Sequence, residues 1–270
     1  MNAKIAYLNG AEPFFAPGGS LGCLCLHGFG ASPAEVRWLA QHLASNGHTV
    51  YAPRLAGHGT QPADLARTRW RDWYASALDG VALLRGACQR VAVIGHSMGG
   101  LLALLLASEG AVEGAAALAS PIQFSRRQVA QVRSLSYVRS YIDVTDRSPL
   151  PQAIRTEQQR RGEPALGRVR YDHWPLAAVL QLFELARTVD RHLHEVAAPL
   201  LLLYSYKDST AGVQHGEYIV ERVNSVCITF EKLQESGHIL PQDCERERVF
   251  ALTAAFVDTL ASAASARAVV

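Results

Sequence analysis

Short apolar runs recur along the 270 residues of the chain, separated by polar, glycine-containing or amphipathic stretches. Each run is about as long as a strand, and a run that is apolar throughout is typical of a strand buried on both faces. We therefore predict strands at 5–8, 21–26, 49–52, 91–94, 114–119, 199–204 and 226–230.

Between these runs, apolar residues recur at helical spacing. The pattern is plain at 68–84, where Trp70, Trp73, Ala77 and Val81 follow it. Further helices are predicted at 33–45, 101–107, 175–188, 213–223 and 244–260. Strands that alternate with helices indicate an α/β fold, with a mostly parallel central sheet and helices on both faces.

Residues 121–174 break this alternation. The segment is rich in Arg, Gln and Ser, and it contains short helical patterns but no clear strand. It therefore predicts an insertion over the ends of the strands.

The composition argues against several classes of partner. Hydrophobic residues make up 49% of the chain, the formal net charge is +2, and no run of Lys and Arg stands out. Nucleic acid binding has no electrostatic footprint here, so we predict no nucleic acid partner. No apolar run approaches the roughly 18 residues that span a bilayer, and the N-terminus lacks a signal-peptide pattern, so we predict no stable membrane insertion.

The five cysteines are odd in number and include no CxxC pair. Cys23, Cys25 and Cys227 fall in strand-like runs, where cysteine usually behaves as a small buried hydrophobe. This usage favours a reduced, cytoplasmic location. We predict no metal and no cofactor, and the sequence makes no prediction of the oligomeric state.

The sequence Gly95-His96-Ser97-Met98-Gly99 matches G-x-S-x-G between a predicted strand and a predicted helix. That order predicts a sharp, strained elbow, with the Ser97 hydroxyl above the sheet edge. Gly95 and Gly99 have no Cβ, so the strand and the helix can approach closely. The free N–H of Met98, at the positive end of the helix dipole, faces any negative charge that develops beside Ser97.

Two further polar residues follow predicted strands. Asp208 comes after the strand at 199–204, and His238 comes after the strand at 226–230. Ligands of open α/β sheets bind beyond the C-terminal ends of the strands, and the order Ser, Asp, His is expected of a hydrolase on such a sheet. We predict that His238 takes the proton of Ser97 as general base, while Asp208 fixes its tautomer and stabilises its imidazolium.

Other acidic residues compete with Asp208 for this role. Glu235 lies so close to His238 in sequence that capping or solvation is the simpler interpretation. Asp190 follows the helix at 175–188, and Asp243 opens the last helix, where the helix dipole favours an acid. We therefore prefer Asp208.

Three other histidines lie near the predicted site. His27 and His58 are flanked by glycine in turns, where a structural hydrogen bond is the favoured interpretation. His96 neighbours Ser97 but is predicted to point elsewhere along the elbow. We assign none of the three a catalytic role.

Acyl transfer also needs hydrogen-bond donors for the tetrahedral oxyanion. The Met98 N–H is one, and the Phe29 N–H is the natural second, because His-Gly-Phe follows a neighbouring strand. Directly after this turn, Ser32 and Pro33 are predicted as the N-cap and first residue of the next helix.

With these residues identified, the chain resembles the α/β-hydrolase superfamily and, within it, the small bacterial carboxylesterases and monoacylglycerol lipases. The resemblance covers residues 24–257 and rests on LCLHGFGASPAEVRWLA, YAPRLAGHGTQPADLARTRWRDW, VAVIGHSMGG, KDST and ESGHIL. It implies the α/β-hydrolase fold, with a small cap or lid inserted at 121–174 and a core domain formed by 1–120 and 175–270.

The resemblance also implies roles for individual residues. The implied catalytic residues are Ser97, Asp208 and His238, and the implied oxyanion-hole donors are the backbone N–H groups of Phe29 and Met98.

An apolar cap face fits an acyl chain. Candidate lining residues are Phe124, Tyr137, Tyr141, Ile142, Trp174, Val179 and Phe183, each weighed against ordinary packing between cap and sheet. Solvated cap surface is the interpretation for Arg126, Arg127, Arg160 and Arg161, with an anionic substrate group as the alternative.

The leading hypothesis is a serine hydrolase of class EC 3.1.1 that acts on a small-molecule acyl ester through an acyl-enzyme intermediate. Its substrates would be short- to medium-chain acyl esters or monoacylglycerols. Alternatives on the same fold are a thioesterase, an acyltransferase and a C–C bond hydrolase of ring-cleavage products. A ligand-binding receptor with vestigial turnover is a further alternative, and the complete set Ser97, Asp208 and His238 argues against it.

Overall fold

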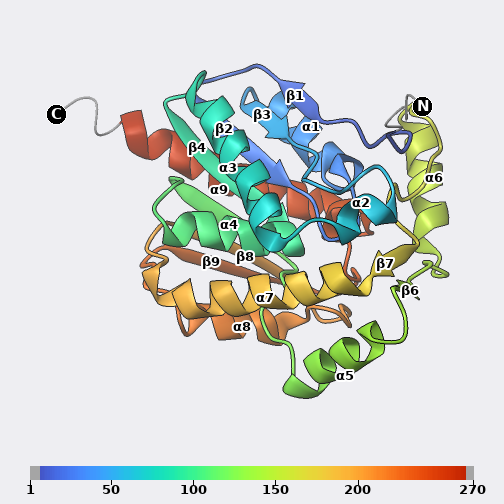
Figure 1. The fold of residues 1–270 in the computed structure, drawn as a ribbon. Coiled ribbons are helices and arrows are strands. Elements are labelled where there is room, and N and C mark those ends of the chain that lie inside the picture. The colour runs from blue at the N-terminus through green and yellow to red at the C-terminus, as the bar shows by residue number, and fades with distance from the viewer. Residues whose placement is uncertain (1–6, 266–270) are drawn as a thin grey trace.

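A seven-stranded sheet lies at the centre of the molecule, with helices packed on both faces (Figure 1). The structure is a computed structural model that describes residues 7–265. The strands of this sheet, in spatial order, are β1 (Phe14–Ala16), β3 (Thr49–Ala52), β2 (Leu21–Leu26), β4 (Arg90–His96), β5 (Gly114–Leu118), β8 (Leu200–Ser205) and β9 (Ile228–Leu233). Within the described sheet, every pairing is parallel except that of β1 with β3. The mostly parallel sheet predicted from the sequence is confirmed.

The helices divide between the two faces. Those that pack on one face are α3 (Trp70–Arg85), α4 (Met98–Ser108), α7 (Leu176–His192) and α8 (Val213–Val220), and those on the other are α1 (Arg37–Ser45) and α9 (Arg246–Ser265). A short helix, α2 (Pro62–Ala66), lies in the loop before α3, and single 3-10 turns are formed by η1 (Pro33–Glu35), η2 (Leu193–Glu195) and η3 (Leu240–Gln242).

Alternate residues of each central strand enter the two halves of the core. In β4, Val91 and Val93 pack under α3 and α4, whereas Ala92 and Ile94 pack under α1 and α9. Because successive side chains of a strand point to opposite faces, burial of both faces requires an unbroken apolar run. For this reason, an unbroken apolar run such as that of β4 predicts a buried strand.

The segment 121–174 carries two helices and two short strands. Its elements are α5 (Arg126–Ser136), β6 (Tyr141–Asp143), α6 (Leu150–Arg160) and β7 (His173–Pro175), and β6 pairs with β7 in a small antiparallel sheet. The sequence showed no clear strand there, because strands of three residues carry too few positions for a period to be visible. In Figure 1, α5 lies below α7, on which it packs, while α6 lies along one edge.

Three local predictions differ from the structure. Of the strand predicted at 5–8, residues 5 and 6 lie outside the described residues, and Tyr7 and Leu8 are not in a strand. The last strand begins at Ile228 rather than at 226, so Cys227 is exposed and not the buried hydrophobe that we predicted. Ser32 precedes η1 but does not cap it, since its hydroxyl donates a hydrogen bond to the carbonyl oxygen of Val169, at 2.8 Å.

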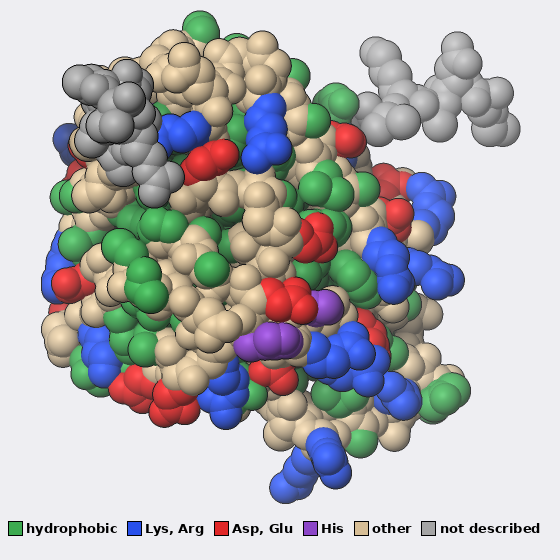
Figure 2. All heavy atoms as spheres, turned by 90° about the vertical axis from the view of Figure 1, so that its left-hand side faces the viewer, with side chains coloured by type: hydrophobic (Ala, Val, Ile, Leu, Met, Phe, Trp, Pro, Cys, Tyr) green, Lys and Arg blue, Asp and Glu red, His purple; other side chains and the backbone are tan. Residues whose placement is uncertain are grey.

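Charges of both signs are mixed on the face shown in Figure 2. Lys and Arg side chains lie there among Asp, Glu and hydrophobic side chains. Exposed ion pairs such as Arg187 with Glu184, at 2.7 Å, contribute little to stability because water screens them.

We expect Gly99→Ala to destabilise the fold, because a Cβ there would collide with the carbonyl oxygen of Leu26 and neither backbone segment can move aside. Overpacking of this kind costs about 2–3 kcal/mol, measurable by urea unfolding. The control is Gly86→Ala, at the right-handed helical end of α3 (φ −68°, ψ −22°), where a Cβ would meet no atom closer than 3.3 Å. Equal stability of the two variants would contradict the close approach at Gly99.

Candidate active site

Ser97 lies at the turn between β4 and α4. Its backbone has φ 54° and ψ −116°, in the left-handed region that is unusual for a residue with a Cβ. A Cβ on Gly95 would collide with the carbonyl group of Gly99, so only glycine fits at both positions. The strained elbow predicted from G-x-S-x-G is thus the observed local geometry.

Two hydrogen bonds connect Ser97, His238 and Asp208. The Ser97 hydroxyl donates to Nε2 of His238 at 3.0 Å, and Nδ1 of His238 donates to Oδ2 of Asp208 at 2.8 Å. We assign the ring proton to Nδ1 because a carboxylate only accepts. The His238 side chain is 20% exposed while that of Asp208 has no exposure, so the ring links a buried charge to an open face. The structure therefore brings the three predicted residues together, and their catalytic roles stay predictions.

Asp208 is held as a carboxylate by its neighbours. Its Oδ1 accepts the backbone N–H groups of Thr210 and Ala211, at 2.7 and 2.9 Å. Burial alone would raise its pKa, but the hydrogen bond and charge of His238, together with these backbone donors, hold the pKa below its ordinary value. Asp208 is therefore ionised near pH 7, and its negative charge can stabilise an imidazolium at His238.

The competing acids have other partners. Glu235 forms an exposed ion pair with Lys207. Asp190 accepts a hydrogen bond from the hydroxyl of Tyr218, at 2.8 Å. Asp243 accepts the N–H of Gly237, at 2.8 Å, and precedes α9 rather than opening it. None of these contacts involves the His238 ring.

The loop after β2 lies against the nucleophile elbow. Register pairs Leu26 with Gly95, so the residues that follow β2 and β4 leave the sheet side by side. A Cβ on Gly28 would lie 3.3 Å from the Cβ of Ser97, which places the turn that carries Phe29 next to the serine. The position suits Phe29 N–H and Met98 N–H as oxyanion donors, and that role stays a prediction.

His27, the first residue of this loop, and His58 are fully buried. In His27, Nδ1 donates to the carbonyl of Gly28 at 2.9 Å and Nε2 accepts the N–H of Leu55 at 3.2 Å. His58 donates from Nδ1 to the carbonyl of Ala56 at 2.9 Å. Burial lowers the pKa of His27 to about 4 and that of His58 to about 3, so both rings are neutral near pH 7. Their contacts with backbone groups agree with the structural interpretation.

A cavity of about 610 Å³ lies between α5 and α7. Of the predicted lining residues, Phe124, Tyr137 and Phe183 line it. The other four are not among its lining residues. Trp174 packs edge-on against Phe29 (ring centroids 5.1 Å apart), Val179 and Ile142 pack in or against the core, and Tyr141 lies in β6 opposite Pro175. Arg126 lines the cavity, and Arg160 and Arg161 pair with Glu157.

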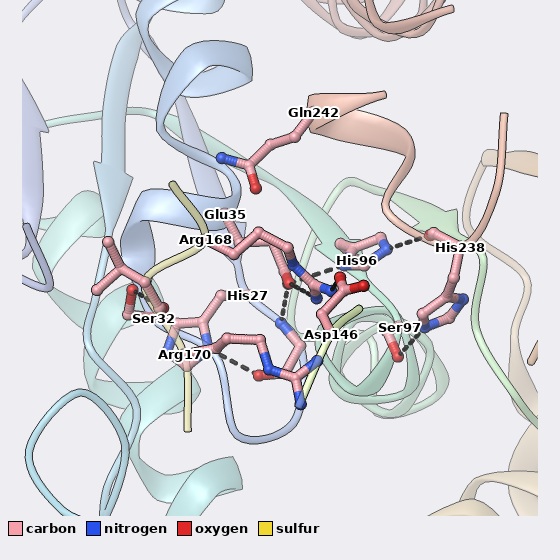
Figure 3. A network of polar contacts seen from close by, with 12 residues as sticks. His27, Ser32, Glu35, His96, Ser97, Asp146, Arg168, Arg170, His238 and Gln242 are labelled. Carbon is pink, nitrogen blue, oxygen red and sulfur yellow. Dashed lines mark hydrogen bonds and ion pairs between the residues drawn. The ribbon is translucent and has the colours of Figure 1, made fainter. Parts of the chain in front are cut away.

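Sequence reasoning missed Glu35 and Arg168, which lie behind Ser97 in a buried polar network (Figure 3). His96 points away from the Ser97 hydroxyl, as predicted, and contacts Glu35 and the carbonyl of His238. A glutamate in an amphipathic segment usually lies on the solvated face, so no signal in the sequence marked Glu35 as buried.

Neither a metal site nor a membrane span is found in the described part of the chain. Among residues 7–265, no three His, Cys, Asp or Glu side chains are placed to hold a metal ion together. No helix within that range combines the length and apolarity needed to cross a bilayer. The cytoplasmic location stays a prediction.

The chain is similar to known families and proteins over most of its length. The family model Hydrolase_4, described as serine aminopeptidase, S33, matches residues 21–245. The thermostable monoacylglycerol lipase of Bacillus sp. (strain H-257) is 30% identical over 254 residues, which is 92% of this chain and 95% of that protein. The carboxylesterase of Bacillus subtilis (strain 168) is 27% identical over 239 residues, 88% of this chain and 92% of that protein.

Solved structures agree with these matches. The structure reported for LipS and LipT, two metagenome-derived lipolytic enzymes, has a TM-score of 0.84 and 26% identity, and covers 94% of this chain and 100% of that one. The monoacylglycerol lipase of Paleococcus ferrophilus has a TM-score of 0.74 at 18% identity, covers 92% of this chain and 99% of that one, and supports the fold.

We expect Asp208→Asn to slow the reaction of Ser97 with a fluorophosphonate by about 10³-fold or more, since an amide neither fixes the His238 tautomer nor stabilises its cation. The matched variant Glu235→Gln should change the rate by less than about twofold, because it removes an exposed ion pair. Labelling reactions that are quenched at successive times and analysed by intact-mass spectrometry give both rates. The opposite ranking would make Glu235 the acid.

Proposed function

The chain belongs to the Hydrolase_4 family of the α/β hydrolases, and from that premise we propose that it hydrolyses carboxylic esters of short- to medium-chain acyl groups, monoacylglycerols included. At the coarser level it is an esterase- or lipase-like serine hydrolase. The observation that carries the proposal is the hydrogen-bonded line from Ser97 through His238 to Asp208 at the C-terminal edge of the sheet. Both Bacillus relatives are named as ester hydrolases, which favours an ester over the peptide of the family's description.

The proposed reaction proceeds through an acyl-enzyme. Nε2 of His238 accepts the Ser97 proton as Oγ attacks the ester carbonyl, and the N–H groups of Phe29 and Met98 hold the oxyanion. The imidazolium then gives its proton to the alcohol as the C–O bond breaks. His238 then takes a proton from water, which attacks the acyl-enzyme. The imidazolium returns that proton to Oγ of Ser97 as the acyl–Oγ bond breaks and the acid leaves.

We further propose that the cavity between α5 and α7 takes the acyl chain. Its volume lies within the usual range of small-molecule sites, and Ile122, Phe124, Val129 and Phe183 give it apolar walls. Its lining begins at Ile122, a few residues after β5, the strand beside the one that leads to Ser97, and it includes none of Ser97, Asp208 and His238. Its lining residues include charged side chains, among them Arg133, which could contact a polar head group.

Segment 121–174 would act as the cap on a core of 1–120 and 175–270. Its α6 half is fastened to the core, because buried Glu157 pairs with Arg246 of α9 at 3.0 Å and Arg161 lies over the ring of Trp38. Its α5 half has no buried residue along its described length. The α5 half is therefore the part suited to admit substrate.

The proposal predicts a single fluorophosphonate adduct on Ser97 and turnover of p-nitrophenyl esters that peaks at short or medium chains. Ser97→Ala should lower the hydrolysis rate by at least about 10⁴-fold with an unchanged circular dichroism spectrum, because no other group supplies the nucleophile. Peptide mapping and a chain-length series measure both. Labelling without turnover of any ester would overturn the esterase assignment and favour an acyltransferase, a thioesterase, a C–C hydrolase or a receptor.

A second prediction concerns chain length. Ala130 lines the cavity from α5, whereas the next residue, Gln131, does not. Ala130→Trp should fill the cavity and shift the preferred acyl chain to a shorter one, while Gln131→Trp should leave the chain-length profile as in the native protein. The ratio of kcat/KM for long and short p-nitrophenyl esters is the readout. Parallel profiles for the two variants would mean that the acyl chain binds elsewhere.

A further inference from the structure

Glu35 and His96 form a buried pair directly behind the nucleophile. Oε1 of Glu35 lies 2.8 Å from Nδ1 of His96, and their side chains are 6% and 1% exposed. Nε2 of His96 lies 2.8 Å from the backbone carbonyl oxygen of His238. His96 precedes Ser97 in the chain, so the pair touches the site without touching the serine hydroxyl (Figure 3).

The hydrogen-bond inventory of this pair requires an extra proton. A neutral imidazole has a single N–H, yet both nitrogens of His96 face oxygen acceptors. Oε1 of Glu35 also accepts the N–H of Gly28, at 2.8 Å. Both contacts of His96 are hydrogen bonds only when the pair carries one proton beyond those of a neutral ring and a carboxylate. An imidazolium beside a carboxylate meets that requirement.

The charged groups around the pair favour this state. Nη2 of Arg168 lies 3.8 Å from Oε2 of Glu35, and Arg168 itself pairs with Asp146 of the segment 121–174. Burial opposes ionisation of both partners, but each holds the other charged, so the pKa of His96 lies above its ordinary value and that of Glu35 well below.

Other ionisable groups face His96 from the neighbouring loops. The ring of His238 is 5.1 Å from that of His96, centroid to centroid. The buried Asp208 carboxylate favours the charged form of His96, whereas His27 is neutral near pH 7 because burial lowers its pKa to about 4.

The pair contacts two loops, one of which carries the proposed oxyanion donor and the other the proposed general base. Through Gly28 N–H, Glu35 holds the turn that presents Phe29. Through the carbonyl of His238, His96 holds the loop that presents the base. We propose that Glu35 and His96 are positioning residues, whose buried ion pair fixes the distance between the oxyanion donor and the general base. The proposal rests on the ester hydrolase function proposed above.

The test compares two substitutions of His96 that have similar bulk. In His96→Gln, the side-chain amide can still donate to the carbonyl of His238, at the place where Nε2 now lies. In His96→Leu, no donor remains. A role in packing alone predicts equal kcat for the two variants, whereas positioning predicts that Gln restores what Leu loses.

For His96→Leu we expect kcat to fall about 100-fold, because a small displacement of the base is costly, with KM changed by less than about twofold. The kcat of His96→Gln should be at least about tenfold higher than that of His96→Leu. The rate of fluorophosphonate labelling of Ser97 should follow kcat, since both need the base in place. Thermal unfolding of the two variants is recorded beside the kinetics, so that a difference in folded fraction is not read as positioning.

The native protein supplies a second, independent measurement. Nitrogen-15 NMR of the His96 ring, assigned by its loss in His96→Gln, should show both ring nitrogens protonated at pH 7. A neutral His96 ring, or equal kcat for the Gln and Leu variants, overturns the proposal. Native protein that is neither labelled at Ser97 nor active on esters refutes the hydrolase function instead, and the NMR result still decides the state of the pair.

Discussion

The close approach of backbone segments at the start of α4 is the constraint on which the site depends. Gly99 lies against the carbonyl group of Leu26 at the end of β2, and Gly95 lies against Gly99. No side chain fits between them, so Ser97 takes a strained conformation that lifts its hydroxyl from the sheet. Because the strands on either side are parallel, their C-terminal ends reach the same edge, and the loops that carry Asp208 and His238 meet the serine there.

His238 is held from two directions at this edge. The Asp208 carboxylate accepts a hydrogen bond from Nδ1 of the His238 ring. Nε2 of His96 donates to the backbone carbonyl of His238. Both supports end in a buried carboxylate, Asp208 in one case and Glu35 in the other. Asp208 also accepts two backbone N–H groups, and Glu35 accepts one. A buried charge is stable only when it is paired and hydrogen-bonded, so these carboxylates require the loops to keep their partners in place.

The segment 121–174 has one half that is fastened to the core and another half that borders the cavity. Ser32 and Glu35 reach it from the core, through Val169 and Arg168, and Glu157 fastens α6 to α9. The α5 half borders the cavity that we propose for the acyl chain. Under the proposed function, reaction chemistry and substrate choice would thus reside in different parts of one chain.

The sequence by itself determined the alternation of strands and helices, the elbow at Ser97 and the chain order of Ser97, Asp208 and His238. These features are local or periodic: burial on two faces demands an apolar run, and a tight turn demands glycine. Only the tertiary structure decided that Glu35 is buried, that Ser32 binds Val169 instead of capping η1, and that three of seven apolar residues line one cavity. Their neighbours lie far away in the chain. The type of a residue indicates its local structural preference, but a partner that overrides this preference comes from a distant part of the chain and is brought close only by folding.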